Sequence, residues 1–156
     1  MFQTIVLAVD GSEQSNWALN YAATLAKESG GRILAVHVRE LMAGRAAGPV
    51  HVNEDEIEAG IRAQVKQLND DGIKTELQIT STMTGGPAHV IAEAAEKEGA
   101  DVIVTGTRGH TAIAGVFLGS VAQRLLHVAP CPVLVVPDTA ATAGARASAG
   151  EAAAVS

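Results

Sequence analysis

The sequence has little of what would define several common classes of protein. Its 156 residues include one cysteine, Cys131, which excludes an intrachain disulfide and a cluster of thiolate metal ligands. Lysine and arginine number 11 against 17 acidic residues, which gives a net charge of −6. Binding to a nucleic-acid backbone depends on lysine and arginine contacts, so we expect no nucleic-acid partner.

A long apolar run is missing as well. No stretch is long enough to span a bilayer, and Met1 to Thr4 lack the basic and small-residue flanks of a signal peptide. These absences predict a cytoplasmic protein without membrane insertion. Apolar residues still make up 47% of the chain and charged residues 18%, which is typical of one globular domain.

Short apolar runs alternate with amphipathic stretches. One of the runs, 73–80, alternates apolar with polar residues, which indicates a half-solvated strand at a sheet edge. Strands alternating with helices predict a parallel α/β sheet with right-handed crossovers. The runs typical of strands buried on both faces are 4–9, 33–38, 101–105 and 132–136. The expected helices are one between a Ser12 cap and a stop at Gly30, then 54–69, 88–98 and 121–127.

The first helix carries the large aromatic side chains. Trp17 and Tyr21 lie four residues apart, in a stripe that continues to Leu25 beside a row of alanines. We interpret this stripe as the face that packs on the sheet, with stacking on a cofactor as the alternative.

Two further segments bound the domain. Residues 40–53 form a long loop after a strand, at the end of the sheet where ligands bind, and this position favours a functional or mobile connection. Residues 138–156 are small and show no apolar period, so we predict a domain over 1–137 followed by a disordered, alanine-rich tail. A helical extension is the alternative for the tail, although glycines interrupt it.

The chain is organised around the stretch 106–121, between a buried strand and a helix. Gly106 and Gly109 allow positive φ and a close approach of backbone amides to a ligand, and Gly119 and Ser120 mark the start of the helix. Such a loop suits phosphate. The dinucleotide fingerprint needs one residue between its first two glycines, whereas two residues separate Gly106 from Gly109. The lysine that the P-loop needs before its serine is also missing.

The spacing Gly-x2-Gly, nine residues, then Gly-Ser resembles the ATP-binding type of the universal stress protein family. Other matching pieces are Ile5-Val-Leu-Ala-Val-Asp-Gly-Ser12, Ala35-Val-His-Val38, Gly86-Pro-Ala-His89 and Cys131-Pro-Val-Leu-Val-Val136. The resemblance implies one doubly wound sheet of five parallel strands in the order 3-2-1-4-5 with four helices, like the adenine-nucleotide alpha-hydrolases. It also implies a homodimer, and ATP as the ligand, with Mg²⁺ as an optional companion.

The resemblance implies roles for eleven residues. Asp10 would hold the ribose hydroxyls or a metal, and a turn or capping carboxylate before Ser12 is an even alternative. Val38 would contact adenine through its main chain and Ala8 would line the ribose side. Backbone donors to the phosphates would come from Gly106, Thr107, Gly109, Gly119, Ser120 and Val121, with Arg108 and His110 beside them. A plain strand-to-helix turn, with Ser120 as its N-cap, is the alternative for the loop.

The remaining candidate residues are interpreted as structural. His37, His51, His89 and His127 show no zinc-binding spacing, so no metal site is predicted. Cys131, between two prolines at the start of a strand, is expected to be buried and inert.

Three functions remain open at this point. The first is an ATP-binding stress-response protein whose nucleotide occupancy changes its oligomer or its regulatory protein partner, with no catalytic residue. The second is a slow ATP hydrolase on the same site, for which no base is evident. The third is a nucleotide-free interaction module that dimerises through the apolar strand Val133 to Val136.

Overall fold

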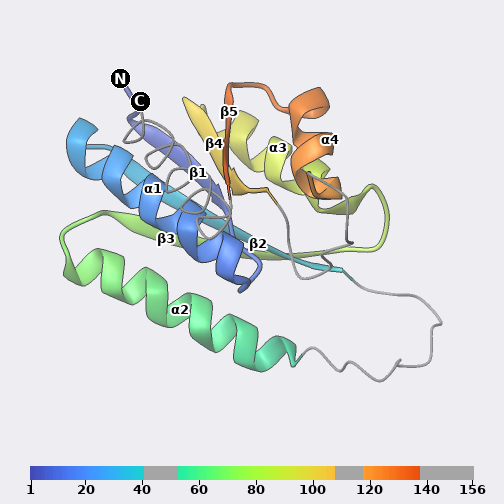
Figure 1. Cartoon of the computed structure of the whole chain (residues 1–156), viewed down its shortest axis with the longest axis horizontal. Coiled ribbons are helices and arrows are strands. Elements are labelled where there is room, and N and C mark those ends of the chain that lie inside the picture. Colours follow the sequence, from blue (N-terminus) through green and yellow to red (C-terminus); the bar gives the residue numbers. More distant parts are fainter. Residues whose placement is uncertain (41–52, 108–117, 138–156) are drawn as a thin grey trace, which may run out of the picture.

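The fold is an α/β sandwich built on one sheet (Figure 1). A computed structural model of the chain describes residues 1–40, 53–107 and 118–137. Most of the predicted 40–53 loop and the predicted tail lie outside this range. In chain order the elements are β1 (Thr4–Ala8), α1 (Glu13–Ser29), β2 (Arg32–Glu40), α2 (Glu54–Asp70), β3 (Thr75–Thr82), α3 (Gly86–Glu98), β4 (Val102–Gly106), α4 (Ser120–Val128) and β5 (Val133–Val136).

The five strands form one parallel sheet in the order β3-β2-β1-β4-β5, which confirms the predicted topology. β1 is central: Leu7 faces Ala35 of β2 on one side and Val104 of β4 on the other. The strand order therefore reverses at the boundary between β1 and β4. In open parallel sheets such a boundary leaves a crevice at the carboxyl ends of the strands, where ligands bind.

Helices cover both faces of the sheet, α1 and α2 on one and α3 and α4 on the other (Figure 1). Strand side chains alternate between the two layers, so Ile5, Leu7 and Val9 face α1 and α2 whereas Val6 faces α3 and α4. All four side chains are fully or almost fully buried. Burial on both faces explains the continuous apolar runs in the sequence.

The prediction that Trp17 and Tyr21 belong to the core was wrong. The side chains are 39% and 48% exposed, and the neighbouring stripe of Ala18, Ala22 and Ala26 is buried instead. Alanine lets the helix axis come close to the sheet, whereas an indole ring in the same place would hold the helix away. The two stripes are adjacent on the helix, so burying the alanines turns the aromatic rings outward.

The ends of α1 match the sequence signals. Ser12 caps the helix, since its Oγ accepts the N–H of Ser15 at 3.2 Å, and Gly30 ends it in the left-handed conformation with φ of 67°.

β2 continues to Glu40, beyond the predicted end at Val38, and β3 starts at Thr75 and forms one edge of the sheet. None of the described helices is both long enough and apolar enough to cross a membrane.

Candidate functional site

The candidate site lies at the carboxyl edge of the sheet, where β1 and β4 end side by side. Leu7 and Val104 are partners across this pair, so the chain beyond Ala8 and the chain at Gly106 leave the sheet at neighbouring positions. The sequence predicted Asp10 and Gly106 for this place from two separate motifs. The structure brings both to the same edge.

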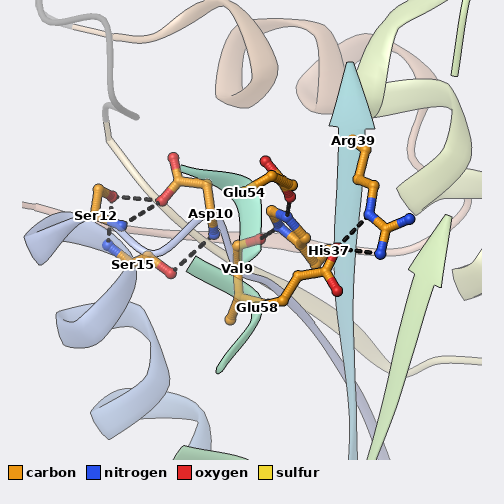
Figure 2. A network of polar contacts seen from close by, with 8 residues as sticks. All are labelled: Val9, Asp10, Ser12, Ser15, His37, Arg39, Glu54 and Glu58. Carbon is orange, nitrogen blue, oxygen red and sulfur yellow. Dashed lines mark hydrogen bonds and ion pairs between the residues drawn. The ribbon is translucent and has the colours of Figure 1, made fainter. Parts of the chain in front are cut away.

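Asp10 is held in the turn that leads from β1 into α1. Its Oδ1 accepts the N–H of Ser12 at 2.9 Å and the hydroxyl of Ser12 at 2.5 Å (Figure 2). Its own N–H points to Ser15 Oγ at 3.3 Å. The carboxylate therefore has the turn-forming role that the sequence left as an alternative, and binding a ligand would be a second role.

Gly106 is required for close packing rather than for an unusual backbone angle. The φ of Gly106 is not positive, contrary to the expectation that glycine there permits a left-handed turn. A Cβ at this position would lie 3.0 Å from the carbonyl oxygen of Gln14 and 3.1 Å from its Cβ. The first turn of α1 thus rests against the end of β4.

The two ends of the segment after β4 are joined by a hydrogen bond. Gly119 N–H donates to the carbonyl oxygen of Thr107 at 2.6 Å, and Thr107 N–H donates to the carbonyl oxygen of Val136 at 3.1 Å, so two of the expected phosphate donors are bonded within the protein. Gly119 is the N-cap of α4 and Ser120 is its first residue, so the alternative of Ser120 as the N-cap was wrong. The first helical bond runs from Gln123 N–H to Gly119, and the N–H groups before it lie at the positive end of the helix dipole.

The other predicted site residues fall into two groups. Ala8, Val38 and Val121 are half-buried and pack against the same cluster, on the face that α3 and α4 cover. Ser120 is exposed at the start of α4. Arg108, Gly109 and His110 lie outside the described residues.

His37 connects three elements at this edge. It is 4% exposed, and its Nδ1 lies 2.8 Å from the carbonyl oxygen of Val9, at the end of β1. Its Nε2 contacts Oε1 of Glu54, the first residue of α2 (Figure 2). The histidine thus ties β2 to the residue before Asp10 and to the start of α2.

A second pair runs beside the first. Arg39, two residues along β2, binds Glu58, one turn along α2 (Figure 2). Strand residues two apart and helix residues four apart each share one face, which explains the parallel pairs. From the sequence we interpreted His37 as structural and did not identify either glutamate as a partner, although a histidine and an arginine at alternate strand positions before an acidic helix start were a signal.

The remaining candidate metal ligands are the thiol and the described carboxylates near the sheet. Cys131 is half-buried, and burial raises the pKa of its thiol above the ordinary value. Within the parts of the chain that the structure describes, no three His, Cys, Asp or Glu side chains are grouped to hold a metal ion.

Known proteins share this architecture. A family model, that of the universal stress protein family, matches residues 1–137. The chain belongs to the universal stress protein family. The match covers every described strand and helix, including both ends of the segment between Gly106 and Gly119.

Members of the universal stress protein family with similar sequences match along almost their whole length. One from Thermus aquaticus is 36% identical over 138 residues, which cover 87% of this chain and 99% of that protein. Universal stress protein YxiE of Bacillus subtilis is 34% identical over 151 residues, with the same two shares. The matched part of this chain therefore corresponds to almost the full length of these relatives.

Two solved universal stress proteins of similar fold contain adenine nucleotides. One, in complex with cAMP, superposes with a TM-score of 0.62 at 27% identity and covers 86% of this chain and 97% of that chain. The other, from Archaeoglobus fulgidus in complex with dAMP, gives a TM-score of 0.60 at 25% identity with the same coverage. Both nucleotides carry the same base.

Proposed function

We propose that this universal stress protein binds ATP at the carboxyl edge between β1 and β4 and acts as a cytoplasmic regulator in the stress response. One observation carries the proposal. The end of β1, the end of β4 and the start of α4 converge where the strand order reverses, which is where parallel sheets of this type bind nucleotides.

The phosphates would lie against the start of α4. The N–H groups of Ser120 and Val121 precede the first helical hydrogen bond, and the positive end of the helix dipole favours an anion there. We assign Gly106, Thr107 and Gly119 to the same wall. Arg108, Gly109 and His110 complete the phosphate loop in this proposal.

The base and the sugar would lie toward β1 and β2. Ala8 and Val38 are half-buried on the face that α3 and α4 cover, and Asp10 lies two residues after the end of β1. We assign the main chain of Val38 to adenine, Ala8 to the ribose wall and Asp10 to the ribose hydroxyls. The complexes of related proteins with cAMP and dAMP support an adenine nucleotide as the ligand class.

The proposed role of ATP is regulatory. Nucleotide occupancy would change the oligomer or the affinity for a protein partner, and no residue is assigned to catalysis. Mg²⁺ would be held mainly by the phosphates and water. In nucleotide sites this ion keeps several waters, so it needs only one or two carboxylates from the protein.

The decisive experiment is to denature the purified protein and to identify any released nucleotide by chromatography. Released ATP, or binding of added Mg-ATP by calorimetry, is the expected result. Released ADP would favour the slow hydrolase instead. A protein that releases nothing and does not bind Mg-ATP would overturn the proposal.

One substitution distinguishes an effect on ATP affinity from an effect on the stability of the fold. In Ser120→Asp the new carboxylate would stabilise α4, because an acidic side chain favours a helix N-terminus, and at the same time it would repel phosphate. We expect unchanged or raised thermal stability with ATP affinity lowered about tenfold or more. Asn20→Asp, at an exposed position in the middle of α1, is the control for net charge and should bind ATP normally.

We also propose a homodimer through β5, the edge strand at the other end of the sheet from β3. Among the described residues, two of the exposed large apolar side chains belong to β5 and to the helix before it: Leu134 of β5 is 37% exposed and Leu126 of α4 is 56% exposed. An apolar strand edge with unpaired backbone groups favours pairing with a second copy.

The aromatic rings of α1 extend this surface. Leu19 and Ala23 line the groove between α1 and α2. Trp17 and Tyr21 lie on the opposite flank of the helix, toward β5, which α1 also contacts. A partner paired along β5 would cover side chains from both helical layers.

A further inference from the structure

The pair His37 and Glu54 carries an inference about how the proposed site is regulated. His37 lies close to the carboxyl edge of the sheet, and each of its ring nitrogens has a hydrogen-bond partner (Figure 2). Nothing in the ATP-binding role requires such a group. Its position between β1 and α2 makes it the link between the residue before Asp10 and the start of a helix.

The partners of His37 determine where its protons are. The carbonyl oxygen of Val9 can only accept, so Nδ1 carries a hydrogen. An ionised carboxylate can also only accept, so the contact between Nε2 and Glu54 needs a further proton, on the ring or on the carboxyl group. The link is complete only while the pair holds that proton.

Loss of this proton would leave a lone pair on Nε2 facing a negative carboxylate. The link between β2 and the start of α2 should therefore be complete while the pair holds this proton and should weaken as the pH rises and the proton is lost.

The other charged groups around His37 do not replace the link. On α2, Glu58 is already bound to Arg39 of β2. Asp10, next to Val9, binds Ser12. Ile79 of β3, the register partner of His37, carries no charge. Glu54 is therefore the group that responds to the ring.

The ring also fixes the backbone on which the proposed ligand would rest. Val9 is held to β2 by its N–H, which donates to Val36 at 3.0 Å, and by its carbonyl oxygen, which accepts from His37. Asp10 follows Val9, and Val38 follows His37. Loss of the ring's contact with Val9 would remove one of the two bonds that hold this residue to β2.

We propose that His37 is a positioning residue whose proton-dependent contact with Glu54 makes nucleotide affinity fall as the pH rises. The inference rests on the proposed function, because it concerns the affinity of that same site. It gives the protein a response to alkaline conditions that needs no residue in contact with the nucleotide.

The test compares Glu54→Gln with the natural protein. The glutamine amide can donate to the unprotonated Nε2 of His37, so the contact survives without the extra proton. ATP affinity is measured by calorimetry at about pH 6 and about pH 8.5. The titration of ATP itself is common to both proteins and cancels in the ratio of their affinities.

We expect this ratio to change by up to about tenfold between the two pH values, with the natural protein losing affinity at the higher pH. Glu58→Gln is the matched control, because it removes the charge from the neighbouring pair with Arg39, and that pair contains no histidine. Its affinity ratio to the natural protein should be the same at both pH values.

Nitrogen NMR of the His37 ring supplies a readout that a merely structural role would not move. In the natural protein the ring signals should change with pH together with ATP affinity. Identical pH dependence of affinity in the natural protein and Glu54→Gln would overturn the inference alone. Absence of ATP binding at both pH values would overturn the proposed function and the inference together.

Discussion

The carbonyl oxygen of Gln14, in the first turn of α1, lies 3.0 Å from the point where a Cβ on Gly106 would stand. Carbon atoms rarely come this close to a backbone oxygen, so a side chain at Gly106 requires α1 to move. Since Gln14 follows the turn that holds Asp10, the glycine couples the end of β4 to the turn after β1.

We expect Gly106→Val to lower the free energy of unfolding by about 1–3 kcal/mol, because extra volume in a packed contact displaces backbone. Urea unfolding measures the effect. Gly60 provides the control, because a Cβ there would meet no atom within 4 Å in the middle of α2. Gly60→Ala should stabilise the protein by about 0.5–1 kcal/mol, and equal effects at both positions would contradict the packing argument.

Asp101 should make the stability depend on acid. Its carboxylate accepts the N–H of Thr4 at 2.9 Å and of Gln3 at 2.8 Å, and these bonds hold its pKa below the ordinary value. A carboxyl group with a lowered folded pKa stabilises the fold above its unfolded pKa, about 3.9, and loses that effect as the pH falls through the folded value.

Asp101→Asn should therefore have a lower urea midpoint than the natural protein near neutrality. The difference should shrink below about pH 4 as the natural carboxylate is protonated. A constant difference from neutral to strongly acidic pH would show that the effect is one of shape and not of charge.

Dimerisation can be followed with the only tryptophan of the chain. Trp17 is 39% exposed in the single chain and lies on the proposed dimer surface. Its emission should shift to shorter wavelength as the protein concentration rises through the dissociation constant, because the ring leaves water. Leu134→Lys places a charge on the β5 edge and should give a monomer by light scattering, with emission independent of concentration.

Cys131 should react slowly with iodoacetamide near neutral pH. Burial raises the pKa of its thiol, and the nearby charge of Asp101 adds to this effect, so little thiolate is present. Unfolding in urea should accelerate labelling. Asp101→Asn should accelerate it slightly in the folded protein, and labelling at the rate of a free thiol would contradict burial as the cause.

The strands could be predicted from sequence because burial on both faces leaves continuous apolar runs, as in Thr4–Ala8. The strand order came from the family resemblance. The aromatic stripe of α1 was misjudged because periodicity identifies two adjacent stripes but does not choose between them. Close packing of α1 on the sheet favours burial of the alanines over burial of Trp17.

The site was predictable in part. Motifs at Asp10 and Gly106 each follow a strand, and parallel strands end at one edge, so their meeting could be expected. The contact of His37 with Glu54 could not, because it joins residues 17 apart across the segment 41–52 and depends on where α2 begins. The alternation of His37 and Arg39 before an acidic helix start was a signal, but it did not indicate which carboxylates these side chains would meet.

The bond between Gly119 N–H and Thr107 fastens the sheet to α4 at the base of the segment that separates them. Because this fastening uses only main-chain atoms, it does not depend on the side chains in between. The join between β4 and α4 can therefore be kept while side chains around it change. A related chain could gain a new ligand, or lose its ligand altogether, while it keeps this main-chain bond and the fold that depends on it.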